Sequence, residues 1–78
     1  IPIRKVVQTA LSMGATGVIL THNHPAGVAL PSHEDMLTTR SILDALKMVD
    51  VQLIDHVIVA DGEGTSMLEN RRMPQPPR

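Results

Sequence analysis

The sequence predicts a small α/β domain with the order helix, strand, helix, strand, strand. Two segments carry apolar residues at helical spacing, short β-branched runs follow each of them, and turns rich in Gly or Pro separate the segments. A chain of 78 residues is long enough for one small domain. Because such a domain buries only about 60% of its unfolded surface, we expect it to need a metal, a partner or further chain for stability.

Residues 2–13 are predicted to form an amphipathic helix. Pro2 suits the first helical turn, where its missing N–H would be unpaired in any case. Apolar residues then recur at i, i+3, i+4, i+7 and i+8, namely Ile3, Val6, Val7, Ala10 and Leu11. Gly14 is placed to end the helix in the left-handed conformation.

A short apolar run over residues 17–22 predicts a buried strand that ends at His22. Residues 23–31 contain Pro25, Gly27 and Pro31 and are predicted to be a loop. The chain begins at Ile1, within the first helix, so we expect it to lack N-terminal strands of the domain. The strand at 17–22 would then have no neighbour, and an exposed strand edge favours a homo-oligomer.

Ser32 is the predicted N-cap of a second helix that extends to about Met48. Asp35 completes a Ser-x-x-acid pattern that resembles a capping box, although Glu or Gln is the usual partner. The inward-facing candidates of this helix are Met36, Leu43, Leu46 and Val49.

The C-terminal part of the chain predicts two strands and a tail. Residues 51–60 are predicted to form one strand with a break at Asp55, residues 61–64 a hairpin turn, and residues 65–68 the last strand. Residues 70–78 contain Pro74, Pro76 and Pro77 and are predicted to be a disordered tail, so the domain would cover residues 1–69.

Composition argues against several function classes. Seven basic and eight acidic residues are scattered along the chain, and Phe, Tyr and Trp are absent, so neither a basic stripe nor a stacking platform for nucleic acid is present. Without cysteine, no thiolate metal site or disulfide is available. No signal peptide or apolar run of about 18 residues is found, so we expect a cytoplasmic protein with no membrane contact.

His22, His24 and Asp35 are the candidate metal ligands. Side chains two residues apart on a strand share one face, and the loop and second helix can bring Asp35 back to the same point. Two imidazoles and one carboxylate suit Zn²⁺, and three protein ligands leave the fourth position for water, as in catalytic sites. Zinc lowers the pKa of that water toward about 7 and polarises a carbonyl, which are the two requirements of amide hydrolysis.

The spacing of these residues resembles a known motif. His22-x-His24, seven residues, Ser32, two residues and Asp35 match the JAMM (MPN+) motif, and residues 21–27, 31–32 and 53–59 resemble the C-terminal two-thirds of a RadC-like domain. The resemblance implies a fragment of the JAMM, cytidine-deaminase-like architecture. It also implies zinc held by His22, His24 and Asp35, an oxyanion stabilised by Ser32, and a peptide or protein substrate cleaved by a metallopeptidase or isopeptidase.

The chain departs from that family in two respects. The family's general base is a glutamate on an earlier strand, and none of Glu34, Glu63 and Glu69 occupies its position. Glu34 lies about 100° around the helix from Asp35 and is expected to point away from the metal. We therefore expect the chain to bind zinc but to turn over poorly unless another chain supplies a carboxylate. Residues 65–67 also replace the aromatic residues that are usual after the hairpin turn.

Simpler roles stay open for several of these residues. Ser32 can be a plain N-cap, which is worth about 1 kcal/mol, and Asp35 can be a capping acid that compensates the helix dipole. His33 is predicted to face solvent. Asp55 and His56 can form a hydrogen-bonded pair that supports the sheet, or can support a ligand histidine.

Two other function classes also stay open. One is a non-catalytic interaction module associated with DNA repair, in which zinc is structural only; hydrolysis by an N-terminally extended chain would exclude it. The other is a nucleic-acid-associated protein, because RadC-like proteins carry a DNA-repair name. That class predicts salt-dependent DNA binding, which its absence at about 50 mM salt would exclude, and the sequence gives it no physical support.

Overall fold

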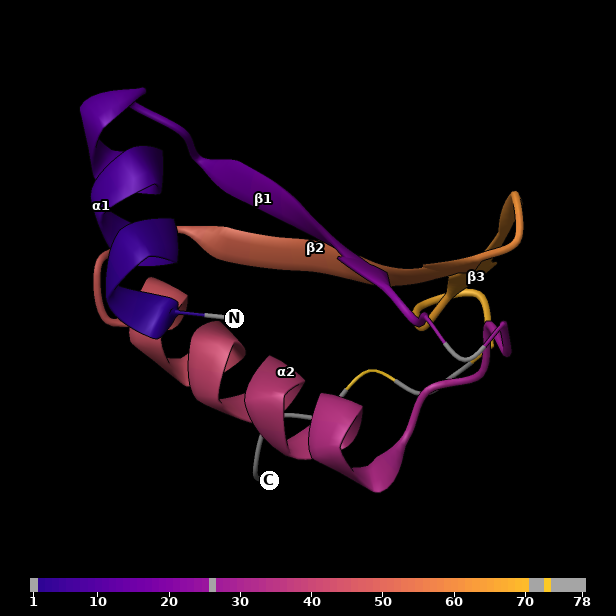
Figure 1. The fold of residues 1–78 in the computed structure, drawn as a ribbon. Helices are drawn as coiled ribbons and strands as arrows, with labels where there is room; N and C mark the ends of the chain where they lie inside the picture. The colour runs from indigo at the N-terminus through magenta and orange to yellow at the C-terminus, as the bar shows by residue number, and fades with distance from the viewer. Residues whose placement is uncertain (1, 26, 71–72, 74–78) are drawn as a thin grey trace.

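The computed structural model of the chain describes residues 2–25, 27–70 and 73. The elements are α1 (Ile3–Ser12), β1 (Gly17–Asn23), α2 (His33–Lys47), β2 (Gln52–Ala60) and β3 (Glu63–Ser66). Within these ranges the three strands form one sheet in the order β1-β2-β3, and α1 and α2 pack against one face of it (Figure 1). The predicted fold class and element order are confirmed.

β1 has a neighbour, and the prediction that it would sit alone is wrong. It pairs in parallel with β2 along its whole length, from Gly17 opposite Gln52 to Asn23 opposite Val59. The prediction looked for an upstream partner, whereas the crossover through α2 brings in a strand from further along the chain. In the described part of the chain no strand pairs with the other edge of β1.

β2 is continuous through Asp55, where a break was predicted. The β1–β2 register instead shifts between Val18 and Ile19, so that Ile54 is the extra residue of a bulge. After the bulge, His56, Ile58 and Ala60 are buried on the face that α2 covers, while Asp55 contacts the segment after β3. The predicted irregularity is therefore present, as a bulge within one strand.

The hairpin between β2 and β3 is tighter than predicted. Its turn consists of Asp61 and Gly62, with φ values of 49° and 78°. Two residues with positive φ are typical of a type I′ turn, whose twist suits a two-residue hairpin. β3 consequently begins at Glu63 and ends at Ser66, two residues earlier than the predicted strand at 65–68.

Both helices begin or end as their local sequence predicts. α1 stops before Gly14, which has a φ of 64°. α2 begins after the N-cap Ser32, with the capping box to Asp35 formed. Of the predicted inward-facing residues of α2, Leu46 is buried and the others are partly buried. The buried positions of α2 are Asp35, Thr39, Ile42 and Leu46.

The apolar core lies between the two helices and the beginnings of β1 and β2, at the end of the sheet near α1 (Figure 1). Its buried members are Ala10, Leu20, Ile42, Leu46, Val51 and Leu53. Within the predicted tail, Asn70 donates to the Ser66 carbonyl and Met73 packs against this core; the rest of that prediction lies outside the described residues. Among the described residues, neither helix has the length and apolar character needed to cross a bilayer.

Candidate metal centre

The structure brings His22, His24 and Asp35 together at the end of the sheet opposite α1. His22 lies in β1, and His24 follows it with a backbone N–H that donates to the Val59 carbonyl at 2.8 Å. This bond continues the parallel pairing past the strand end, so both imidazoles keep to the same face. Asp35 comes from the first turn of α2. One candidate ligand atom from each of the three residues lies within 4.8 Å of the others.

Each imidazole faces one oxygen of the Asp35 carboxylate. His22 Nδ1 is 2.9 Å from Asp35 Oδ1, and His24 Nε2 is 2.9 Å from Asp35 Oδ2. The two rings meet edge to face, with centroids 4.9 Å apart and an interplanar angle of 87°. The carboxylate is 3% exposed. A buried anion is thus flanked by two nitrogens, which is a donor set that suits a divalent cation such as zinc.

His24 is oriented by a backbone carbonyl. Its Nδ1 lies 2.9 Å from the Val28 oxygen. Since a carbonyl only accepts, Nδ1 carries the proton, and in the neutral ring Nε2 is left with a lone pair aimed at the carboxylate. A lone pair 2.9 Å from a carboxylate oxygen requires a cation between them, either a second proton or a metal ion. An imidazole held in this way by a carbonyl is a common arrangement for a metal ligand.

Asp35 is held in the ionised form that a ligand needs. The backbone N–H and hydroxyl of Ser32 both donate to Oδ2, at 2.7 and 2.8 Å, and the Asp35 N–H donates back to the Ser32 hydroxyl at 3.1 Å. Burial raises the pKa of Asp35, but the hydrogen bonds from Ser32 and the contacts with the two imidazoles outweigh it, so the pKa is lowered. The carboxylate is therefore charged at neutral pH.

A polar cavity of about 320 Å³ opens beside these residues. It is lined by His22, His24, Ser32, Glu34, Asp35 and Thr38. Glu34 borders the cavity although it was predicted to point away, because at the first turn of a helix a 100° step leaves a side chain at the rim. Its carboxylate is not part of the group of candidate ligand atoms. His33 is exposed, as predicted.

Two residues lie beneath the site: His56, which the sequence left open as support for a ligand histidine, and Thr39, which the sequence did not single out. His56 is fully buried, and its ring stacks on His22 with centroids 6.1 Å apart and an interplanar angle of 24°. His56 Nδ1 is 2.6 Å from the hydroxyl of Thr39, which donates to the Asp35 carbonyl at 2.5 Å. Burial lowers the pKa of His56, so the ring is neutral at neutral pH. The position of Thr39, one helical turn after Asp35, was the available signal.

Asp55 and His56 have separate roles, although they are adjacent. Asp55 Oδ1 accepts the backbone N–H groups of His56 and Leu68, at 2.7 and 2.9 Å, and its other oxygen accepts the Ser66 hydroxyl. The Asp55 side chain therefore supports the end of the β2–β3 hairpin. His56, in contrast, lies against a candidate ligand.

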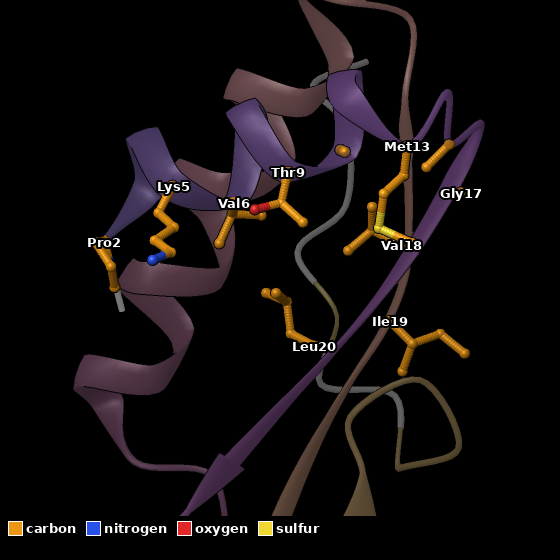
Figure 2. Close-up of a pocket in the computed structure, with 11 residues that line it drawn as sticks. Pro2, Lys5, Val6, Thr9, Met13, Gly17, Val18, Ile19 and Leu20 are labelled. Carbon is orange, nitrogen blue, oxygen red and sulfur yellow. The ribbon is translucent and has the colours of Figure 1, made fainter.

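A larger cavity, of about 600 Å³, lies between α1 and β1 and is mainly apolar (Figure 2). In the figure Met13 lies beside Val18, and Lys5 extends from α1 at the far end of the cavity from Met13. The cavity has no cluster of ligating or nucleophilic side chains among its lining residues. The chemistry of the described chain is concentrated at the opposite end of the sheet.

The α-β-α-β-β fold, with a His-x-His strand end facing a Ser-x-x-Asp helix start, defines a domain of the JAMM or MPN class. The chain belongs to the RadC-like JAB domain family, whose model matches residues 1–73.

The matching relatives are longer than this chain. It is similar to a "UPF0758 protein" of Stutzerimonas stutzeri, with 54% identity over 66 residues, and to one of Tolumonas auensis, with 50% identity over 66 residues. Each match covers 85% of this chain and 30% of the relative. A "UPF0758 protein" of Pseudomonas syringae pv. tomato is 50% identical over 70 residues, covering 90% of this chain and 31% of the relative. The chain thus spans about a third of the length of these relatives.

Proposed function

We propose that this chain is the metal-binding part of a zinc-dependent hydrolase that cleaves amide bonds in a peptide or protein substrate. The observation that carries the proposal is the position of His24: its protonated Nδ1 is fixed on Val28, and its Nε2 faces a buried carboxylate that His22 also contacts. This donor set suits a divalent cation, and the JAMM-type spacing of its members implies zinc.

His22, His24 and Asp35 would hold the zinc, which when bound supplies an acidified water and polarises the substrate carbonyl. Ser32 donates its hydroxyl to Asp35 Oδ2 and borders the 320 Å³ cavity. In the proposed reaction this hydroxyl, which has a single proton, turns from Asp35 Oδ2 and donates to the oxygen on which negative charge develops as the amide carbonyl is attacked. The remaining cavity volume is available for the scissile amide.

The general base is proposed to come from outside these 78 residues. Among the described glutamates, Glu34 borders the cavity from the first turn of α2 and not from an earlier strand, where the family's base lies, while Glu63 and Glu69 belong to the hairpin region. Since the chain spans 30% of the first relatives, a base on the remaining part is consistent with the family's use of an upstream glutamate. The 78-residue chain is therefore expected to bind zinc with little turnover.

Zinc content tests the metal site. After dialysis against trace zinc, the wild-type chain is expected to carry about one zinc and His24→Ala much less, because one of three ligands is lost. His33→Ala is the matched control, since His33 is an exposed histidine in the same region. Equal zinc content in the wild type and His24→Ala would refute the proposed ligand set.

Hydrolysis tests the reaction. A chain extended by the upstream segment of its relatives is expected to cleave amide substrates, and Ser32→Ala is expected to lower its kcat by about 10²-fold if the hydroxyl stabilises the oxyanion. A zinc-loaded extended chain with no activity on a broad peptide library would favour the second candidate, a non-catalytic zinc module. The observation that favours this candidate is that no described glutamate, Glu34 at the cavity included, lies on a strand before β1, where the family's base is found.

A further inference from the structure

We propose that His56 and Thr39 form a buried positioning pair that holds β1 and α2 at the spacing that zinc binding by His22 and Asp35 requires. The proposal rests on the metal site proposed above, and it assigns a role to two residues which that reaction does not use.

His22 depends on ring contacts more than His24 does. His24 is fixed by the Val28 carbonyl, whereas the polar contact of His22 in the described residues is with Asp35. The side chain of His22 is 37% exposed, against 18% for His24. Apart from its contact with Asp35, its orientation rests on the ring of His24 and on the buried ring of His56, with centroids at 4.9 and 6.1 Å.

Thr39 connects His56 to the other ligand-bearing element. A threonine hydroxyl has one proton, and here it goes to the Asp35 carbonyl one helical turn earlier. The bond to His56 must then be donated by Nδ1–H of the ring. The resulting chain of hydrogen bonds runs from His56 on β2, through Thr39, to the backbone of Asp35 on α2. Both side chains are fully buried, so each bond is costly to leave unmade.

An imidazole at position 56 is a poor choice if filling the core is its only task. With Nδ1–H donated, Nε2 carries a lone pair, and this buried atom has no hydrogen-bond partner among the described residues. An unpaired buried polar atom destabilises the fold, and a phenyl ring of similar shape would avoid it. Unlike a phenyl ring, the imidazole can form the hydrogen bond to Thr39, and it does so beneath the stacked ring of His22. The contacts of His56 thus point to the metal site.

The test compares zinc affinity with fold stability in the full 78-residue chain. His56→Phe keeps a flat ring and removes the donor, Thr39→Val removes the hydroxyl at constant shape, and Thr39→Ser keeps the hydroxyl. Ile42→Val is the matched control, because Ile42 is fully buried on the same helix within the apolar core. Zinc Kd is measured by competition with a chromophoric chelator, Co²⁺ coordination by its visible absorption, and zinc-free stability by urea unfolding followed by circular dichroism.

His56→Phe and Thr39→Val are expected to raise the zinc Kd by about 10-fold and to alter the Co²⁺ absorption, as loss of an outer-sphere partner does in other metal sites. Thr39→Ser is expected to restore the wild-type Kd. The double variant is expected to match the single variants, since both remove the same bond. Ile42→Val is expected to lower zinc-free stability and leave Kd unchanged.

Three results would overturn the proposal, and they differ in what else they overturn. A Kd within about twofold of wild type in both His56→Phe and Thr39→Val would refute the positioning pair and leave the metal site standing. A Kd that follows stability in every variant, Ile42→Val included, would reduce the pair to core packing. A wild-type chain that binds no zinc would refute both the pair and the proposed function. Zinc binding that depends on the pair, without hydrolysis by the extended chain, would support the pair and count against the hydrolase alone.

Discussion

Two buried aspartates in this small domain have much in common and differ in their partners. Asp35 is 3% exposed and Asp55 is 9% exposed, both accept a serine hydroxyl, and the pKa of both is lowered by hydrogen bonds that outweigh burial. Asp55 accepts hydrogen bonds from two backbone N–H groups and a hydroxyl, and it is not part of the group of candidate metal ligands. Asp35 faces two imidazole nitrogens, which are themselves candidate metal ligands. Burial and a lowered pKa therefore do not identify a functional carboxylate; the chemistry of its partners does.

The largest expected difference is in metal content. Asp35→Asn removes the anionic ligand and is expected to abolish zinc binding while α2 stays capped, because the amide oxygen can still accept from Ser32. Asp55→Asn is expected to keep about one zinc and to lower the free energy of unfolding by about 1–3 kcal/mol, since at least one buried donor loses its charged acceptor. Elemental analysis and urea unfolding of both variants measure the two effects. Zinc retained by Asp35→Asn would refute the inference that Asp35, unlike Asp55, is a zinc ligand.

Added zinc should stabilise the chain through the Asp35 region alone. At a free zinc concentration of about 1,000 times Kd, binding to the folded state contributes about 4 kcal/mol to the free energy of unfolding. Asp55→Asn is expected to gain the same increment as the wild type, and Asp35→Asn none. Thermal unfolding with zinc and after chelation measures it. An equal increment in Asp35→Asn would mean that zinc binds elsewhere.

Two glycines allow a smaller and sharper comparison between the same regions. Gly27, in the loop between β1 and α2, has a φ of 79°, and an added Cβ would lie 2.8 Å from Asp61 Oδ2. Gly62 in the hairpin turn has a φ of 78°, and an added Cβ would meet nothing within 4 Å. Alanine at either position should cost about 1–2 kcal/mol in backbone strain.

Only Gly27→Ala should also weaken zinc binding: the exposed Asp61 side chain can turn away from the added Cβ, but the backbone strain falls in the loop that fixes His24 on Val28. Zinc Kd measured by chelator competition, with Gly62→Ala as the control for stability, tests this expectation. Equal Kd values in the two variants would show that the loop adapts without disturbing His24.

The smallest expected effect is a two-stage loss of stability in acid. The pKa of His56 is lowered in the folded chain by burial, so below its ordinary value of about 6.5 the unfolded chain binds a proton that the folded chain does not. Stability of the zinc-free chain should therefore begin to fall as the pH drops below about 6.5. Asp35 and Asp55, with lowered pKa values, keep their contributions above about 3.9 and lose them only as the pH falls further.

Urea unfolding of the zinc-free chain between pH 7.5 and 3 measures both stages. His56→Phe is expected to reduce the first stage and Asp55→Asn the second. A first stage of unchanged size in His56→Phe would mean that another group is responsible for it.

The grouping of His22, His24 and Asp35 was predictable because its signal is local. A strand end and a helix start each have clear residue patterns, and the Ser32–Asp35 capping box forms as its spacing predicts. The partner of β1 was not predictable in the same way, because parallel pairing joins segments separated by a whole helix and leaves no turn sequence. The sequence did not predict the register shift at Ile54 as such; it predicted only a break in the strand at the next residue, Asp55.

Of the two residues beneath the site, the sequence left His56 open as support for a ligand histidine, but it identified neither Thr39 nor the bond between the two. Thr39 and His56 are polar, and hydrophobic periodicity assigns polar residues to the surface. Their burial follows from a hydrogen bond between residues on α2 and β2, which no single segment encodes. Ile42 was also not predicted as a core residue of α2. The buried face of this helix runs from Asp35 through Thr39 and Ile42 to Leu46. Like the pairing of β1 with β2, this long-range polar pair could be identified only from the three-dimensional structure.

The composition of the chain makes the site unusually easy to observe. The chain contains no Phe, Tyr or Trp and four histidines, so in D₂O, once the N–H protons have exchanged, the aromatic region of its proton NMR spectrum consists of imidazole signals alone. Three of these rings, His22, His24 and His56, lie in contact at the candidate centre, and His33 is exposed and serves as an internal reference. Without isotope labelling of individual residues, a titration with zinc should therefore be followed ring by ring. The same composition removes the usual absorbance at 280 nm, so protein concentration must be measured by another method.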